Sequence, residues 1–188
     1  MNNIAFIDLE IDGRGKIVDA GAVKAGKSIH TSRIAEFVAF ISDADYLCGH
    51  NIIEHDYKYL KSFLPKDYAL IDTLYLSPLL FPRKPYHRLL KDDKLLSDEL
   101  NNPLNDALKA KELFEDEVNA FNNIDKRMQQ IYYELTASDI HFKGFFDQVG
   151  YSPDWRPFFL KKSTADSVKE VLAGKKLPRY RTCHEAIP

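Results

Sequence analysis

Two acidic residues stand inside an apolar run near the start of the chain. Residues 4–11 (IAFIDLEI) predict a β-strand, in which side chains alternate between the two faces of the sheet. Asp8 and Glu10 therefore share one face, and Ile7 and Leu9 share the other. Neighbouring carboxylates repel each other and resist burial, and Mg²⁺ or Mn²⁺, which prefer oxygen ligands, would offset that repulsion. The alternative is an edge strand whose acids face water.

Two further carboxylates stand at the expected starts of helices. Asp56 follows the segment 49–51 (GHN), which ends a short buried strand, and Asp106 lies in the first turns of a long helix expected over residues 101–121. Four carboxylates from three elements can surround two divalent ions about 3.5–4 Å apart, an arrangement that hydrolyses phosphodiester bonds. For each acid taken alone, a helix cap or a solvated side chain is the alternative.

The elements that must position these acids alternate between strands and helices, which predicts an α/β domain. The expected strands span residues 4–11, 17–25, 28–30, 46–49 and 68–71. The expected helices span residues 31–41, 56–60, 73–81, 101–121 and 126–137. Glycine-containing turns at 12–16 and 26–27 make the first three strands an antiparallel meander. Residues 82–99 are charged and irregular, which is typical of a surface loop.

Composition limits the class of protein. A chain of 188 residues with 45% hydrophobic and 29% charged residues suits one globular core with a small appendage. No apolar run approaches the ~18 residues that span a membrane, and no leader precedes the first strand, so a cytoplasmic protein without a membrane partner is expected. Cys48 and Cys183 are expected as free thiols.

Two other kinds of chemistry lack support in the sequence. There is no Gly-x-Ser-x-Gly motif for a serine nucleophile, and no Walker motif for nucleotide hydrolysis. Residues 13–16 (GRGK) are too short for a phosphate-binding loop and lack the following Ser or Thr, so they are interpreted as a turn.

The acidic motifs, taken in order, resemble the DEDD 3′–5′ exonuclease superfamily, whose members share the ribonuclease H-like fold. The resemblance covers residues 4 to about 121. The motifs that carry it are FIDLE (6–10), GHN (49–51) followed by Asp56 and Leu60, DTL (72–74) and NDA (105–107). Three segments also look like the exonuclease-like N-terminal domain of some bacterial RecQ-family DNA helicases: 85–87, 91–95 and 99–103.

The resemblance implies a function and its residues. The activity expected is 3′–5′ hydrolysis of phosphodiester bonds at single-stranded DNA ends with two Mg²⁺ or Mn²⁺ ions. The implied metal-binding and catalytic acids are Asp8, Glu10, Asp56 and Asp106. The implied substrate-binding residues are Leu9, Asn51 and Asn101, with Thr73 as a structural support. DNA is favoured over RNA only through the helicase resemblance, which also implies a RecQ-like helicase as a partner in cis or in trans.

The general base of the family is missing from its usual position. Members carry a His five residues before the last acid, or a Tyr four residues before it, and this chain has Asn101 and Asn102 there. An amide cannot take a proton from water near neutral pH. His87, in the preceding loop, is the candidate substitute, and His55 is a weaker one; a loop-packing histidine is the alternative for His87. Two functions therefore stay open: a slow exonuclease, and a module that binds nucleic acid without cutting it.

The C-terminal third differs from the rest of the chain. Residues 122–125 mark an expected boundary between an exonuclease-like domain (1–122) and a helical, aromatic extension or linker (123–188). Acidic residues outnumber basic ones before that boundary, and basic residues outnumber acidic ones after it. The aromatic residues beyond 141 are expected to pack in a small core; stacking on nucleic-acid bases is the alternative.

Overall fold

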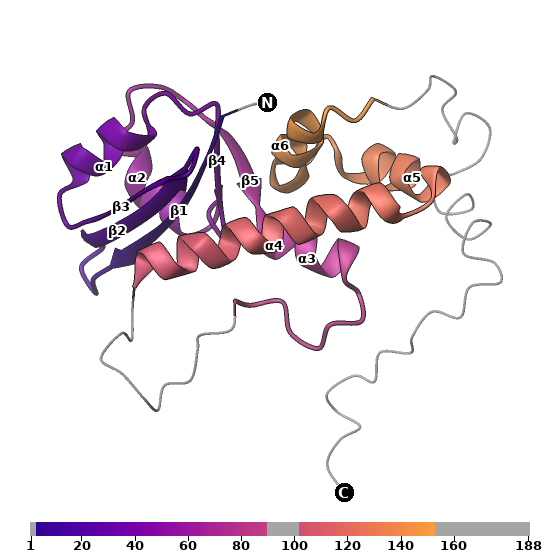
Figure 1. Ribbon diagram of the computed structural model, residues 1–188, viewed down its shortest axis with the longest axis horizontal. Helices are drawn as coiled ribbons and strands as arrows, with labels where there is room; N and C mark the ends of the chain where they lie inside the picture. Colours follow the sequence, from indigo (N-terminus) through magenta and orange to yellow (C-terminus); the bar gives the residue numbers. More distant parts are fainter. Residues whose placement is uncertain (1–2, 90–101, 153–188) are drawn as a thin grey trace, which may run out of the picture. The chain divides into compact units, whose positions relative to one another are not determined.

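The structure, a computed structural model, describes residues 3–89 and 102–152, which form a five-stranded mixed sheet with helices on both faces (Figure 1). The strands are β1 (Ile4–Ile11), β2 (Ile17–Lys24), β3 (Lys27–Thr31), β4 (Tyr46–Gly49) and β5 (Ala69–Asp72). The helices are α1 (Ile34–Ile41), α2 (Asp56–Leu60), the 3₁₀ helix η1 (Lys61–Phe63), α3 (Thr73–Leu80), α4 (Pro103–Asn123), α5 (Lys126–Thr136) and α6 (Ile140–Val149).

Strand β1 lies at the centre of the sheet. The order is β3-β2-β1-β4-β5, with β1 antiparallel to β2 and parallel to β4, and β4 parallel to β5. The predicted α/β class and the opening meander are confirmed, and this order with flanking helices is consistent with a ribonuclease H-like fold. Because β1, β4 and β5 run in the same direction, their carboxyl ends meet at one edge of the sheet, where sites form in such folds.

Alternation along β1 separates two hydrophobic cores. Ala5, Ile7 and Leu9 belong to the first core, which α1 and α2 cover, whereas Phe6 belongs to the second. The second core lies between the other face of the sheet and the later helices. Its buried members are Phe6, Cys48, Ile71, Leu76, Phe114, Phe121, Phe145 and Phe146. The core alternation assigns Asp8 and Glu10 to the face of the second core, as the period of two predicts.

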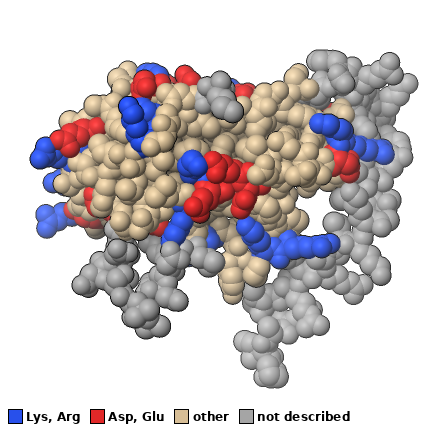
Figure 2. Space-filling model, in the orientation of Figure 1, with Lys and Arg blue, Asp and Glu red and all other residues tan. Residues whose placement is uncertain are grey.

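Helix α4 crosses the second face of the sheet (Figure 1) and contacts β1 and β2. Asn102 caps its start by accepting hydrogen bonds from the N–H groups of Leu104 and Asn105 at 3.0 and 3.4 Å. The helix buries an apolar stripe and exposes an acidic patch over its middle turns (Figure 2), formed by Glu112, Glu115 and Asp116. Within residues 3–89 and 102–152, no helix combines the length and apolar character needed to cross a membrane.

Helix α6 was not expected as an element of its own, and it packs directly on β5. A Cβ atom at Gly144 would lie 1.9 Å from the carbonyl oxygen of Leu70, so only glycine permits this contact. The expected packing of the late aromatics is confirmed for Phe145 and Phe146, whose ring centroids lie 5.4 and 5.7 Å from that of Phe121. The compact unit that holds the sheet ends at Ser152, and the division expected after residue 122 stays a prediction.

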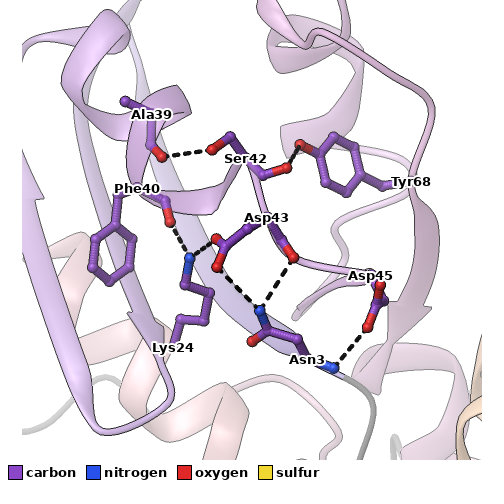
Figure 3. A network of polar contacts seen from close by, with 8 residues as sticks. All are labelled: Asn3, Lys24, Ala39, Phe40, Ser42, Asp43, Asp45 and Tyr68. Atoms are coloured by element: carbon purple, nitrogen blue, oxygen red, sulfur yellow. Dashed lines mark hydrogen bonds and ion pairs between the residues drawn. The ribbon is translucent and has the colours of Figure 1, made fainter.

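A polar network joins the start of β1 to the connection between α1 and β4 (Figure 3). The ammonium group of Lys24 donates to the Asp43 carboxylate and to the carbonyl oxygen of Phe40, and its hydrogen bond lowers the pKa of Asp43. The backbone N–H of Asn3 donates to the Asp45 carboxylate at 2.9 Å. The bond from Asn3 fixes the start of β1 beside β4, and the bonds from Lys24 tie the end of β2 to the end of α1 and the residues that follow it.

Glu117 places a carboxyl group inside the second core. Its side chain is fully buried, and neither of its oxygens has a hydrogen-bond partner among the described residues. Burial raises the pKa of Glu117 to about 9, and the nearby Asp72 carboxylate acts in the same direction. At neutral pH the group is therefore protonated and neutral, the form that a low-dielectric core favours.

We expect Glu117→Gln to flatten the pH dependence of stability. The folded-state pKa of about 9 exceeds the ordinary value of 4.5, so the contribution of this group is fully present below pH 4.5 and is lost as the pH rises toward 9. Within that window the free energy of unfolding should fall by roughly 1.4 kcal/mol per pH unit in the wild type, and less steeply in the variant. Urea denaturation at several pH values measures both slopes. Glu112→Gln, on the exposed face of α4, should keep the wild-type slope; equal slopes for Glu117→Gln and wild type would contradict a buried, protonated carboxyl group.

Candidate active site

One cavity gathers all four acids that the sequence singled out. It has a volume of about 480 Å³ and lies beside the last residues of β1. Its acidic lining residues are Asp8, Glu10, Asp56 and Asp106. Its other lining residues are Leu9, Ile11, His50, Asn51, His55, Leu74, Arg88 and Leu89. Residues up to 98 positions apart thus line a single cavity, as their placement at strand ends and helix starts predicted.

Asp106 reaches this cavity because α4 begins directly on β2. Gly21 is the β2 partner of Asp8, and a Cβ atom on Gly21 would lie 2.2 Å from the backbone nitrogen of Leu104. Glycine at this position therefore lets the first turn of α4 rest on the strand next to β1. Lys109, one turn further along α4, lies with its Nζ atom 4.0 Å from a carboxylate oxygen of Asp106.

Asp56 is the most deeply buried of the four acids, with 2% of its surface exposed. Its Oδ1 atom accepts a hydrogen bond from the backbone N–H of Leu9 at 2.9 Å, which ties the start of α2 to β1. Burial raises the pKa of Asp56. The Oδ2 atom of Asp56 lies 3.7 Å from the Nδ1 atom of His55, and this interaction raises the pKa of His55. A cation in the cavity would offset the cost of ionising this carboxyl group.

The loop that presents Asp56 is held by a second buried carboxylate, Asp72. Its two oxygens accept hydrogen bonds from the backbone N–H groups of Asn51 and Ile53, at 2.9 and 3.1 Å. Asn51 adopts a left-handed backbone with φ of 66°, a conformation that asparagine tolerates better than most residues. Gly49 precedes this turn, and a Cβ atom there would lie 2.9 Å from the carbonyl oxygen of Ile7. The GHN segment is thus a tight turn held against β1.

His50 is a site residue to which sequence reasoning gave no role. Its Nδ1 atom lies 2.9 Å from the Thr73 hydroxyl, which itself donates to the carbonyl oxygen of Gly49 at 3.4 Å. The hydroxyl has one proton, so it accepts from the Nδ1–H of His50, and Nε2 is left with its lone pair. Nε2 is buried and has no hydrogen-bond partner among the described residues. Burial lowers the pKa of His50 to about 4, so the ring is neutral at pH 7.

The remaining predicted residues fall into three places. Leu9 and Asn51 line the acidic cavity, and their role in substrate binding stays a prediction. His87 lies in a neighbouring cavity, where its Nδ1 atom is 2.9 Å from the Ser77 hydroxyl, and its role as general base stays a prediction. Asn101 lies outside the described residues. The only sequence signal for His50 was its position beside Asn51 in the GHN motif.

The donor set of the cavity suits a hard divalent cation. Four carboxylates offer the oxygen ligands that Mg²⁺ and Mn²⁺ prefer, and the desolvated Asp56 gains most from a nearby positive charge. In the conformation described for residues 3–89 and 102–152, no three acidic, histidine or cysteine side chains converge closely enough to hold an ion. Binding therefore requires side-chain rotation within the cavity.

Comparison of the chain with known protein families, with curated proteins and with solved structures found no match.

We expect Gly21→Ala to destabilise the protein by about 1–3 kcal/mol, because the added methyl group would overlap the backbone of the first turn of α4. Gly13→Ala is the matched control, since a Cβ atom at Gly13 would meet no atom within 4 Å, and its effect should stay within about 0.5 kcal/mol. Urea denaturation measures both free energies of unfolding. Equal stability of the two variants would contradict the close packing of α4 on β2.

Proposed function

We propose that this protein is a metal-dependent 3′–5′ exonuclease that hydrolyses phosphodiester bonds at single-stranded DNA ends. The observation that supports the proposal most directly is the convergence of Asp8, Glu10, Asp56 and Asp106 on one cavity. Clustered carboxylates at the carboxyl end of a central strand suit divalent ions better than any other ligand class. The 3′–5′ direction of cleavage and the preference for DNA come only from the family resemblance.

The four acids have distinct parts in this proposal. Asp8, Glu10 and Asp106 would hold the principal ion, and Asp8 with Asp56 would help to hold the second. Divalent ions bound there would activate water and stabilise the negative charge that develops on the phosphate. Asp56 also keeps its hydrogen bond from Leu9, so the helix that carries it remains fixed to β1. The chain thus supplies a rigid backbone frame for movable carboxylates.

His50 supplies the proton acceptor that Asn101 and Asn102 cannot supply. It lines the acidic cavity, whereas His87 lines the neighbouring one. The bond to Thr73 keeps the proton on Nδ1 and leaves Nε2 as the basic atom. Accepting the proton of an attacking water would require the His50 ring to expose Nε2 to the cavity, because that atom is buried and a pKa of about 4 makes it a weak base in the described conformation. Position alone favours His50 over His87 as the base, because His50 lines the acidic cavity.

The second candidate function is a module that binds nucleic acid without cutting it. The observation that favours it is that, across the described ranges, the acidic side chains do not already form a metal-holding group. In this reading the module would position a strand for a RecQ-like helicase, in cis or in trans, a partnership that comes only from the resemblance. Activity separates the two candidates, since both allow metal and strand binding.

We expect the wild-type protein with Mn²⁺ or Mg²⁺ to shorten a 5′-labelled single strand from its 3′ end. Asp8→Ala should lower the rate by roughly 10²–10⁴-fold, because it removes a carboxylate assigned to both ions. Asp116→Ala, on the exposed face of α4, is the matched control and should cut like wild type. A gel ladder resolves the products. If wild type gives no ladder but still binds the strand, the exonuclease proposal is rejected in favour of the binding module.

We expect His50→Gln to lower kcat by about 10²–10⁴-fold, the usual cost of losing a general base, and to leave strand affinity in EDTA unchanged. His87→Gln, compared side by side, should leave kcat within a few-fold of wild type. Single-turnover rates at saturating enzyme measure the difference. A larger loss of rate in His87→Gln than in His50→Gln would assign the role of general base to His87.

A further inference from the structure

A second cavity of about 440 Å³ adjoins the acidic one. Arg88 and Leu89 line both cavities, so the two share a wall. The polar and aromatic residues that line the second cavity are Ser77, Lys84, Tyr86, His87, Arg88 and Lys109. We call it the basic cavity, because three of these side chains are cationic at neutral pH and none of its described lining residues is acidic.

Contacts with α3 hold the segment that forms the basic cavity. The Ser77 hydroxyl is buried in α3 and lies 2.9 Å from the Nδ1 atom of His87. The backbone N–H of Lys84 donates to the carbonyl oxygen of Phe81 at 2.9 Å, and its Nζ atom lies 4.1 Å from the centroid of the Phe81 ring. These contacts fold residues 84–87 back toward α3 and Phe81, the residue that follows it. Basic side chains also gather below the acidic patch of α4 (Figure 2).

The sign of the charge reverses between the two adjoining cavities. The acidic cavity suits cations, and the basic cavity suits anions with several oxygen acceptors. Arg88 lies at their shared wall, and a guanidinium group can bind phosphate oxygens with two parallel hydrogen bonds. Tyr86 adds an aromatic ring that is 77% exposed and is therefore open to stacking.

We infer that the basic cavity binds the phosphodiester backbone of the strand next to the bond being cut, with Tyr86 stacking on a base of that strand. The inference rests on the proposed function for the position of the strand end. Phosphate groups match the cations, and alternating bases and phosphates match an aromatic ring beside cations. Inorganic phosphate and a mononucleotide share part of this chemistry, but they lack the second phosphate and the neighbouring base.

The test measures binding of a fluorescein-labelled single-stranded DNA to the full chain in EDTA, by anisotropy at several salt concentrations. Lys84→Gln and Arg88→Gln should each weaken binding several-fold and reduce the slope of log Kd against log salt by about 0.7. Tyr86→Leu should weaken binding about five-fold or more at every salt concentration and leave the slope unchanged. Lys111→Gln is the control, because Lys111 pairs with Glu115 on the surface of α4 at 2.6 Å.

The outcomes separate this inference from the proposed function. Unchanged slopes for Lys84→Gln and Arg88→Gln would overturn the basic cavity as a strand site, even if wild type degrades DNA. Reduced slopes would support it, even if wild type cuts nothing. Competition by inorganic phosphate as strong as that by the oligonucleotide, at equal phosphate concentration, would also overturn it, because the site would then recognise a free anion and no strand.

Discussion

Repulsion among carboxylates at the end of the central strand is the constraint around which this molecule is arranged. Four acids line one cavity, and one of them is almost completely buried. Backbone N–H groups hold one of these acids and a carboxylate outside the lining: Leu9 donates to Asp56, and Asn51 and Ile53 donate to Asp72. Such fixed dipoles stabilise negative charge without neutralising it. A divalent cation in the cavity would lower the remaining repulsion among the carboxylates.

Close backbone contacts set the position of the acids as much as polar bonds do. Gly21 lets α4 start on β2, and Gly49 lets the GHN turn approach β1. At each glycine an added Cβ atom would overlap a backbone atom, which cannot rotate away as a side chain can. Asp56 and Asp106 thus depend on residues that carry no chemistry themselves. A helix displaced by even one ångström would change which carboxylates can share an ion.

Alternation and capping signals predicted most of the sheet and the acidic set. The period of two in residues 4–11 separated Asp8 from Ile7, and the acids at helix starts indicated where the carboxyl edge would be. What the sequence did not reveal depends on contacts between distant residues. Helix α6 has apolar residues on several sides and a glycine in its middle, and Gly144 is explained only by its contact with Leu70. The contact that orients the His50 ring comes from Thr73, 23 positions away, so no local sequence pattern predicts a role for His50.

Helix α4 contributes one charged residue to each of the two adjoining cavities. Asp106 lines the acidic cavity, and Lys109, one helical turn later, lines the basic one. The Nζ atom of Lys109 and a carboxylate oxygen of Asp106 lie 4.0 Å apart, so the two opposite charges partly cancel. Each residue nevertheless lines a different cavity. A ligand that placed a cation against Asp106 and an anion against Lys109 would replace this ion pair with two more favourable ion pairs. A nucleic-acid end with its divalent ions is such a ligand, since the metal and the phosphate lie next to each other. The spacing of three residues on α4 would therefore link the proposed metal binding to the proposed strand binding through one helix.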